Sequence, residues 1–281
     1  MQLTIIGAGP AYTDRRGAAS ASYLVRAAGS ALLLDLGQGA FPNLAATMEP
    51  STLTAVVVSH LHPDHFVDLV PLRHYLTWEF KPTRHVRVLG PLGLGDRLDA
   101  LHAHPGFAAV SLDVEPLAAG TVRIGPFDVE VRRVTHTDES YAFRISMAPA
   151  NTDGAATDRD TPAGAASGAA TTSGAATASG AATSPGLVYS GDCGNAADLV
   201  PLIRPGDTLL SEASFGAGSV PPGANHLNAA AAASAAGSGR AVRLLLTHIQ
   251  MGYDRGEALA AAQAAFAGPV RLVTEGDRFE V

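Results

Sequence analysis

Short runs of aliphatic and β-branched residues alternate with turns and helical stretches along most of the chain. Each run has about the length of a strand and is bounded by glycine, proline, aspartate or serine, which predicts β-structure. We expect strands at residues 3–6, 31–34, 55–58, 86–89, 122–124, 129–134, 141–145, 187–189, 208–210, 242–246 and 270–273. Helices are expected at residues 66–78, 93–103, 228–236 and 256–266. This mixture indicates an α/β protein.

Local signals refine two of the expected helices. Asn228 is a suitable N-cap for the third helix. Pro71 falls inside the first one, which predicts a kink or a later start. The nearby aromatic residues Tyr75, Trp78 and Phe80 are expected to pack in the core.

One segment, residues 150–186, differs from the rest in composition. Of its 37 residues, 30 are alanine, glycine, serine or threonine, and it has no valine, isoleucine, leucine or aromatic residue. Such a segment has no large apolar side chain with which to form a core, so it predicts a flexible insertion. We expect it to interrupt a hairpin within a single domain that spans residues 1–281.

Composition and charge exclude several classes of protein. The chain is 47% hydrophobic, which excludes a wholly disordered protein, and its 19 Lys and Arg against 26 Asp and Glu argue against a general phosphate-gripping surface. Cys193 is the single cysteine, so no intrachain disulfide can form. No targeting segment or apolar stretch of about 20 residues is visible, and we expect a soluble cytoplasmic protein without a membrane partner.

The densest chemical motif is His60-Leu61-His62-Pro63-Asp64-His65, which directly follows an apolar run. Packing does not readily explain three imidazoles and a carboxylate within six residues, because aspartate is rarely buried without a partner. Both groups are ligands for Zn, Fe, Mn or Ni. The alternating positions 60, 62 and 64 predict side chains that point one way, while His65 can turn to a second metal.

Three more ligand-type residues follow apolar runs, namely His136, Asp192 and His248. Strand ends of this kind carry the sites of many α/β folds. Together with the motif they supply enough ligands for two metals, and Asp192 is our candidate for the carboxylate that bridges them. Asp35 also ends an apolar run, and it either orients a ligand histidine or is a plain turn residue. The seven proposed ligands are His60, His62, Asp64, His65, His136, Asp192 and His248.

The His-x-His-x-Asp-His signature, followed by the three strand-end ligands, resembles the metallo-β-lactamase family. The resemblance covers residues 3–281 outside the insertion, and it implies a four-layer αββα sandwich with a dinuclear site at one edge. It also implies that His60, His62 and His136 hold one metal. Asp64, His65 and His248 would then hold the other, with Asp192 between them.

Residues 211–215, 225–228 and 246–249 are similar to the ribonuclease Z-like phosphodiesterase branch. That resemblance implies a pair of catalytic residues, Glu212 and His226, close to the leaving group; a loop histidine without such a role is the alternative for His226. We count Asp64 among the catalytic residues as well. His62 stands where the flavo-diiron branch usually has glutamate, which favours two Zn²⁺ over iron, with Mn²⁺ or Fe possible. The branch also implies a homodimer.

The function expected from these residues is hydrolysis of a small phosphodiester, such as a cyclic nucleotide, by a metal-bridging hydroxide. In this hypothesis His226, polarised by Glu212, protonates the leaving oxygen. A tRNA partner, as in ribonuclease Z, is disfavoured because residues 150–186 contain one basic residue, Arg159, against three aspartates. Hydrolysis of lactones, thioesters or β-lactams, redox chemistry at iron, and a non-catalytic metal-binding module are the alternatives.

Overall fold

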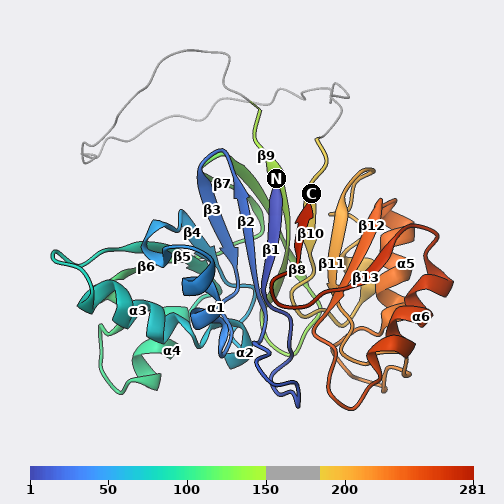
Figure 1. The fold of residues 1–281 in the computed structure, drawn as a ribbon, viewed down its shortest axis with the longest axis horizontal. Coiled ribbons are helices and arrows are strands. Elements are labelled where there is room, and N and C mark those ends of the chain that lie inside the picture. The colour runs from blue at the N-terminus through green and yellow to red at the C-terminus, as the bar shows by residue number, and fades with distance from the viewer. Residues whose placement is uncertain (150–183) are drawn as a thin grey trace, which may run out of the picture.

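Two facing β-sheets form the centre of the molecule (Figure 1). The computed structural model describes residues 1–149 and 184–281, and within these residues each sheet has seven strands. The first sheet has, in spatial order, β14 (Arg278–Glu280), β1 (Gln2–Gly7), β2 (Ser22–Ala27), β3 (Ser30–Leu34), β4 (Ala55–Val57), β5 (Val86–Gly90) and β6 (Leu112–Pro116). The second has β13 (Val270–Leu272), β12 (Arg243–Thr247), β11 (Thr208–Glu212), β10 (Leu187–Tyr189), β9 (Ser140–Met147), β8 (Phe127–Val134) and β7 (Gly120–Ile124).

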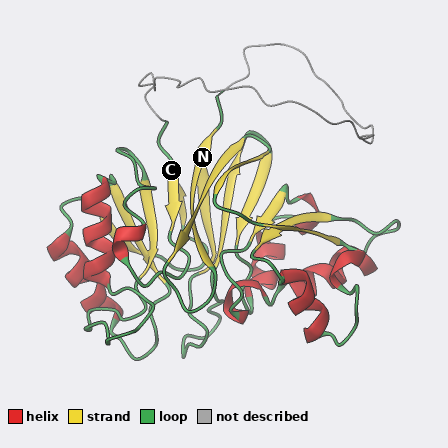
Figure 2. Ribbon diagram, turned by 180° about the vertical axis from the view of Figure 1, so that it is seen from behind, coloured by secondary structure: helices red, strands yellow, loops and turns green. Residues whose placement is uncertain are grey.

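Helices cover the outer face of each sheet, as Figures 1 and 2 show from opposite sides. Those beside the first sheet are α1 (Ala40–Thr47), α2 (Pro63–Phe66), α3 (Leu69–Trp78) and α4 (Leu94–Leu101). Those beside the second are α5 (Ala229–Gly239) and α6 (Arg255–Ala265). Short 3₁₀ turns occur at Pro50–Thr52, Ala108–Val110 and Ala196–Asp198. The expected αββα sandwich is confirmed.

The described part of the chain has no helix with the length and hydropathy needed to cross a membrane.

Three apolar clusters lie between these four layers. The central one joins the inner faces of the two sheets through residues such as Tyr23, Phe127 and Phe143, all buried. A second cluster packs the first sheet against α1, α3 and α4, and a third packs the second sheet against α5 and α6. Burial of these apolar runs makes the main favourable contribution to the stability of the fold. Parallel strands normally need cover on both faces, and here the helices cover the outer face of each sheet.

The local signals explain where the helices begin. Pro71 lies in the first turn of α3, where a missing N–H is tolerated, so the later start is correct and no kink is needed. Asn228 Oδ1 accepts the N–H of Ala231 and caps α5 as expected. The expectation that Trp78 is buried in the core is wrong. It ends α3 and is 70% exposed.

The expected insertion at residues 150–186 lies outside the described residues except for positions 184–186. The strands on either side of it do pair as expected, with Leu187 opposite Ile145 in an antiparallel ladder between β9 and β10. A buried ion pair fastens this region. The Arg144 guanidinium donates to both carboxylate oxygens of Asp207, over 2.7 and 2.9 Å, and Asp207 also accepts the N–H of Gly186.

We expect Asp207→Ala to lower the free energy of unfolding by about 3–5 kcal/mol, because it leaves the Arg144 guanidinium buried without its partner. Urea denaturation would measure the change. The exposed pair of Arg123 and Asp128 supplies the control, since Arg123→Ala should cost less than about 1 kcal/mol. Equal losses in the two variants would show that burial does not set the strength of the Arg144–Asp207 pair.

Candidate metal centre

The strands that carry the candidate ligands end at one edge of the sandwich. His60 follows β4, His136 follows β8, Asp192 follows β10 and His248 follows β12. Strands β10, β11 and β12 are parallel, and β8 runs in the same direction because β9 is antiparallel to both β8 and β10. Their loops gather at the end of the sheets opposite the two chain termini (Figure 1). The topology therefore brings together ligands that are far apart in the sequence.

The candidate side chains form three groups in which the ligand atoms all lie within 4.8 Å of one another. One of them is Asp192, His226 and His248, and the other two contain the seven candidate ligands. Of these two, the first group is His60, His62, His136 and Asp192, and the second is Asp64, His65 and His248. The expectation that positions 60, 62 and 64 point one way is wrong for Asp64. Helix α2 begins at Pro63 and ends the alternation, so Asp64 turns toward His65 and His248.

Asp192 lies between the two groups and faces each with a different oxygen. Its Oδ2 is 3.7 Å from His60 Nε2 in the first group. Its Oδ1 is 3.4 Å from His65 Nε2 and 3.7 Å from His248 Nε2 in the second. A carboxylate in this position could contact two neighbouring cations, one through each oxygen.

The separations between the candidate ligands suit a shared cation better than direct hydrogen bonds. Asp64 Oδ2 is 3.2 Å from His248 Nε2 and 3.7 Å from His65 Nε2. A charge-assisted hydrogen bond between such groups is about 2.7–2.9 Å long. Ligands placed 2.0–2.1 Å from one tetrahedral zinc ion stand about 3.3 Å apart. The observed spacing is close to the second value.

Unpartnered atoms in the cluster support the same interpretation. Among the described residues, His60 Nε2, His65 Nε2 and Asp192 Oδ1 are buried and have no hydrogen-bond partner. Buried polar atoms normally have one, because leaving them unsatisfied is costly. Imidazole and carboxylate are also the ligand set that zinc prefers. The residues therefore fit a metal centre.

Burial and neighbouring charges favour the metal-binding protonation states of His60 and Asp192. Burial lowers the pKa of His60 well below its usual value, so its ring is neutral and has a lone pair to offer. Burial opposes ionisation of Asp192, but the charges of His248 and His65 outweigh it and hold the pKa of that carboxyl well below its usual range. Asp192 is therefore a carboxylate at neutral pH. For His65 and His248 burial lowers the pKa, but nearby carboxylates outweigh it and raise the pKa of both rings.

Asp35, which follows β3, is fully buried behind the cluster. Its Oδ2 accepts hydrogen bonds from His65 Nδ1 over 2.7 Å, from Tyr189 over 2.6 Å and from Ser59 Oγ over 2.8 Å. Its Oδ1 accepts the Ser59 N–H over 2.6 Å. The bond to Nδ1 directs His65 Nε2 into the cluster, which supports the first of the two roles considered for Asp35.

We expect Asp35→Asn to weaken metal affinity by about 10- to 100-fold, because it disturbs the hydrogen bond that orients His65. Titration of the metal-free protein with Zn²⁺ would measure the change. Asp113 forms a comparable pair with His85 on the surface, 2.9 Å long, so Asp113→Asn is the matched control and should have no effect. An unchanged affinity in Asp35→Asn would contradict an orienting role.

Two of the site residues adopt a backbone conformation that is uncommon outside glycine. Asp35 has φ = 58° and His248 has φ = 57°, each at the end of its strand. Such conformations cost on the order of 1–3 kcal/mol and persist where the surroundings impose them. Gly37 has a related role, since a Cβ at this position would lie 1.9 Å from the Asp64 carbonyl oxygen. Because Gly37 has no side chain, the backbone at Asp64 can lie against the segment that follows β3.

Glu212 and His226, the residues expected to act near the leaving group, lie beside the group formed by His60, His62, His136 and Asp192. Glu212 ends β11 and is buried, and its Oε1 is 3.1 Å from His226 Nδ1. His226 Nδ1 is also 3.7 Å from Asp192 Oδ2. Burial lowers the pKa of His226, but the hydrogen bond and charge of Glu212 outweigh it and raise the pKa to about 9. His226 thus holds a proton at neutral pH.

Two serines that the sequence analysis did not select also belong to the site. Ser214 Oγ donates to Glu212 Oε2 over 2.6 Å and lies 3.1 Å from His248 Nδ1. Ser59 Oγ lies 3.1 Å from His60 Nδ1 and 3.3 Å from His65 Nδ1. Both serines stand within two residues of a candidate residue in the sequence, which is the signal that could have identified them.

Comparisons with known proteins agree with this geometry. Residues 32–249 match the family model of the β-lactamase superfamily domain. An uncharacterized protein of Mycobacterium leprae is 31% identical over all of this chain and 89% of its own length. The probable metallo-hydrolase YhfI of Bacillus subtilis is 25% identical, with 98% of each chain covered.

Solved structures show the same fold. The crystal structure of YhfI, a metallo-β-lactamase fold protein, matches with a TM-score of 0.78 at 21% identity, covering 99% of this chain and 98% of that one. The short form of human tRNase Z matches with a TM-score of 0.68 at 18% identity, covering 100% and 99%. A diphosphatase from the PhnP family matches with a TM-score of 0.67 at 16% identity, covering 100% and 97%.

Proposed function

This chain belongs to the β-lactamase superfamily, and from that premise we propose that it is a dinuclear zinc hydrolase of small phosphodiesters, with cyclic nucleotides as the favoured substrates. The cluster of histidines and aspartates supports a divalent metal site. Asp192 supports a pair of ions, because its two oxygens face the two ligand groups.

In this proposal His60, His62 and His136 would hold one ion, Asp64, His65 and His248 would hold the other, and Asp192 is placed to serve both groups. When bound, the ions would supply Lewis acidity and lower the pKa of water from 15.7 to about 7. Asp35 keeps His65 oriented from behind. The remaining chemistry, proton transfer to the leaving group, falls to His226 and Glu212.

The pairing of Glu212 with His226 carries the proposal of a phosphodiesterase. A phosphodiester loses an alkoxide, which is a poor leaving group unless it receives a proton. Glu212 engages Nδ1 of His226, which leaves Nε2 to donate a proton to the leaving oxygen. General acid catalysis of this kind contributes roughly 10²–10⁴ in rate. Four hydrogen-bond donors besides His226 engage Glu212, which makes it a positioning residue held in place.

A tRNA substrate is the second candidate, because a tRNase Z is among the structures with the same fold. A tRNA-binding surface needs clustered basic residues that neutralise phosphates. The chain has a formal net charge of −7, and residues 150–186 contain a single basic residue. These charges favour the smaller phosphodiester.

The test is metal analysis combined with a substrate panel near neutral pH. We expect two zinc ions per chain and metal-dependent turnover of bis-p-nitrophenyl phosphate and cyclic AMP. A lactone and a precursor tRNA complete the panel, and turnover of either one in place of the small phosphodiesters would contradict the proposal. Iron with redox activity would do so as well.

The proposed homodimer and the cytoplasmic location rest on the family resemblance and on the sequence, and they stay predictions. Light scattering of the purified protein and fractionation of cells would test them separately from the hydrolytic activity.

A further inference from the structure

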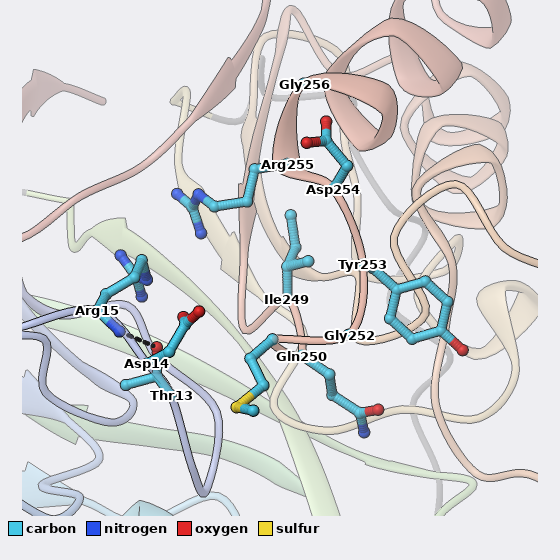
Figure 3. A pocket seen from close by; sticks show the side chains of 11 residues that line it. Thr13, Asp14, Arg15, Ile249, Gln250, Gly252, Tyr253, Asp254, Arg255 and Gly256 are labelled. Atoms are coloured by element: carbon cyan, nitrogen blue, oxygen red, sulfur yellow. Dashed lines mark hydrogen bonds between the residues drawn. The ribbon is translucent and has the colours of Figure 1, made fainter.

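A cavity of about 420 Å³ lies beside the candidate metal centre, on the loop that follows His248 (Figure 3). Residues 13–15 of the loop between β1 and β2 form one wall. The other wall is formed by residues 249–256, which lead into α6. None of the seven candidate metal ligands lines this cavity, and neither do Glu212 and His226.

Two arginine side chains, Arg15 and Arg255, face each other across one side of the cavity (Figure 3). Within residues 1–149 and 184–281, the Arg15 guanidinium forms no hydrogen bond, and its ion-pair contact is Glu275 Oε2 at 3.8 Å. Arg255 donates one hydrogen bond, from Nη2 to the Val273 carbonyl over 3.0 Å. Arg15 Nη2 and Arg255 Nη1 are buried without a partner in that part of the chain.

These two guanidinium groups together have ten N–H donors, yet a single one is used in a hydrogen bond. Arg15 Nη2 and Arg255 Nη1 are the buried ones, and leaving charged buried donors unsatisfied is costly, whereas the other donors belong to side chains that are partly exposed. Glu275 forms no hydrogen bond with them, because its Oε2 lies 3.8 Å from Arg15 Nη1 and its Oε1 accepts the N–H groups of Ala8 and Ala19. The two arginines therefore have unused capacity to bind an anion with several oxygens.

The electrostatics of the cavity point the same way. Burial lowers the pKa of Arg255, the positive charge of Arg15 lowers it further, and Glu275 offsets part of this. The two cations thus repel each other with incomplete neutralisation.

Two acidic residues also line the cavity and must be weighed. Asp254 Oδ1 caps α6 by accepting the N–H of Glu257 over 2.8 Å, so the negative charge of this residue is held at the start of the helix. Asp14 is exposed at the cavity edge and forms no ion pair with a described residue. Its negative charge would oppose the binding of an anion. Removing that charge should therefore strengthen binding, whereas removing an arginine should weaken it.

We propose that this cavity is a phosphate-binding site in which Arg15 and Arg255 hold one phosphate group. Each arginine can bind a phosphate through two parallel hydrogen bonds, and four such contacts fit a tetrahedral anion better than a carboxylate. The cavity is larger than a bare phosphate ion needs and leaves room for an attached group. The phosphate therefore belongs either to free inorganic phosphate or to a mononucleotide. The site does not depend on the proposed hydrolytic activity.

Calorimetric titration of the full chain with inorganic phosphate, and separately with adenosine 5′-monophosphate, tests the proposal. Both titrations are run on the protein as purified and after removal of metal with a chelator. Binding should persist without metal, and Arg15→Gln and Arg255→Gln should each weaken it by about 10- to 100-fold. Arg16→Gln, on the same loop but outside the cavity, is the matched control and should not change it.

Asp14→Asn should strengthen binding several-fold, because it removes a negative charge from the cavity edge. An increase in this variant cannot be produced by misfolding, so it keeps the test decisive if an arginine variant is unstable. If the mononucleotide binds more tightly than inorganic phosphate, the site is assigned to the phosphate of a nucleotide. If the two bind equally, it is assigned to free inorganic phosphate. Absence of binding, or binding that disappears with the metal and ignores both arginines, would overturn the proposal.

Discussion

Replacing Asp192 with asparagine is expected to remove at least one metal ion per chain and to reduce turnover of a phosphodiester on the order of 10³-fold or more. Asp192 faces the two ligand groups with its two oxygens, so an amide NH₂ in place of one oxygen would break the connection. The negative charge that offsets two cations would be lost as well. The rate is expected to depend on the ions, because bound divalent cations would lower the pKa of water to about 7. Metal analysis and kcat measure the two effects.

Asp138→Asn is the control for this change. Its carboxylate is exposed and lies 3.5 Å from His62 Nε2, so the variant removes a negative charge near the same histidines without touching the centre of the cluster. We expect it to keep its metals and most of its turnover. Full metal content and normal turnover in Asp192→Asn would show that the seven candidate ligands do not form one centre.

Several strands buried on both faces were readily predicted from the sequence, but β2, a mostly buried central strand of the first sheet, was missed. Every residue of Ala55–Val57 and of Leu187–Tyr189 is buried, so both appear as short apolar runs bounded by turns. Some strands at the edge of a sheet lack this signal. β14 consists of Arg278, Phe279 and Glu280, two of which are exposed, and it was not predicted. The first helix, Ala40–Thr47, was also missed because it has no side-chain cap and contains Pro42.

The convergence of the candidate ligands was predictable for a different reason. Parallel strands place their C-terminal ends at one edge, so residues at strand ends converge whatever their separation in the sequence. The turn of Asp64 away from His62 was not predictable by alternation, since the backbone becomes helical at Pro63. The contact of Asp35 with Tyr189 was not predictable either. It joins the two sheets across 154 positions, and no local pattern encodes such a pairing.

His226→Ala is expected to retain the metal ions and to lose about 10²- to 10⁴-fold in kcat, because the variant lacks the acid that protonates the leaving oxygen. His102→Ala is the control, since His102 packs against His74 and Phe107 on the far helices and should be neutral. A substrate with a good leaving group, such as bis-p-nitrophenyl phosphate, needs less protonation. The loss should therefore be smaller for this compound than for a cyclic nucleotide.

The pH dependence distinguishes an acid from a merely structural histidine. The pKa of His226 is raised to about 9, so the ring is protonated below this value and loses its proton as the pH rises through it. Turnover of the unmodified protein should fall above pH 9, and His226→Ala should lack that fall. His226 also stands within ligand distance of Asp192 and His248, which makes a metal-binding role the specific alternative. Loss of metal in His226→Ala would establish that alternative, whereas retained metal with a flattened alkaline limb would identify His226 as the acid.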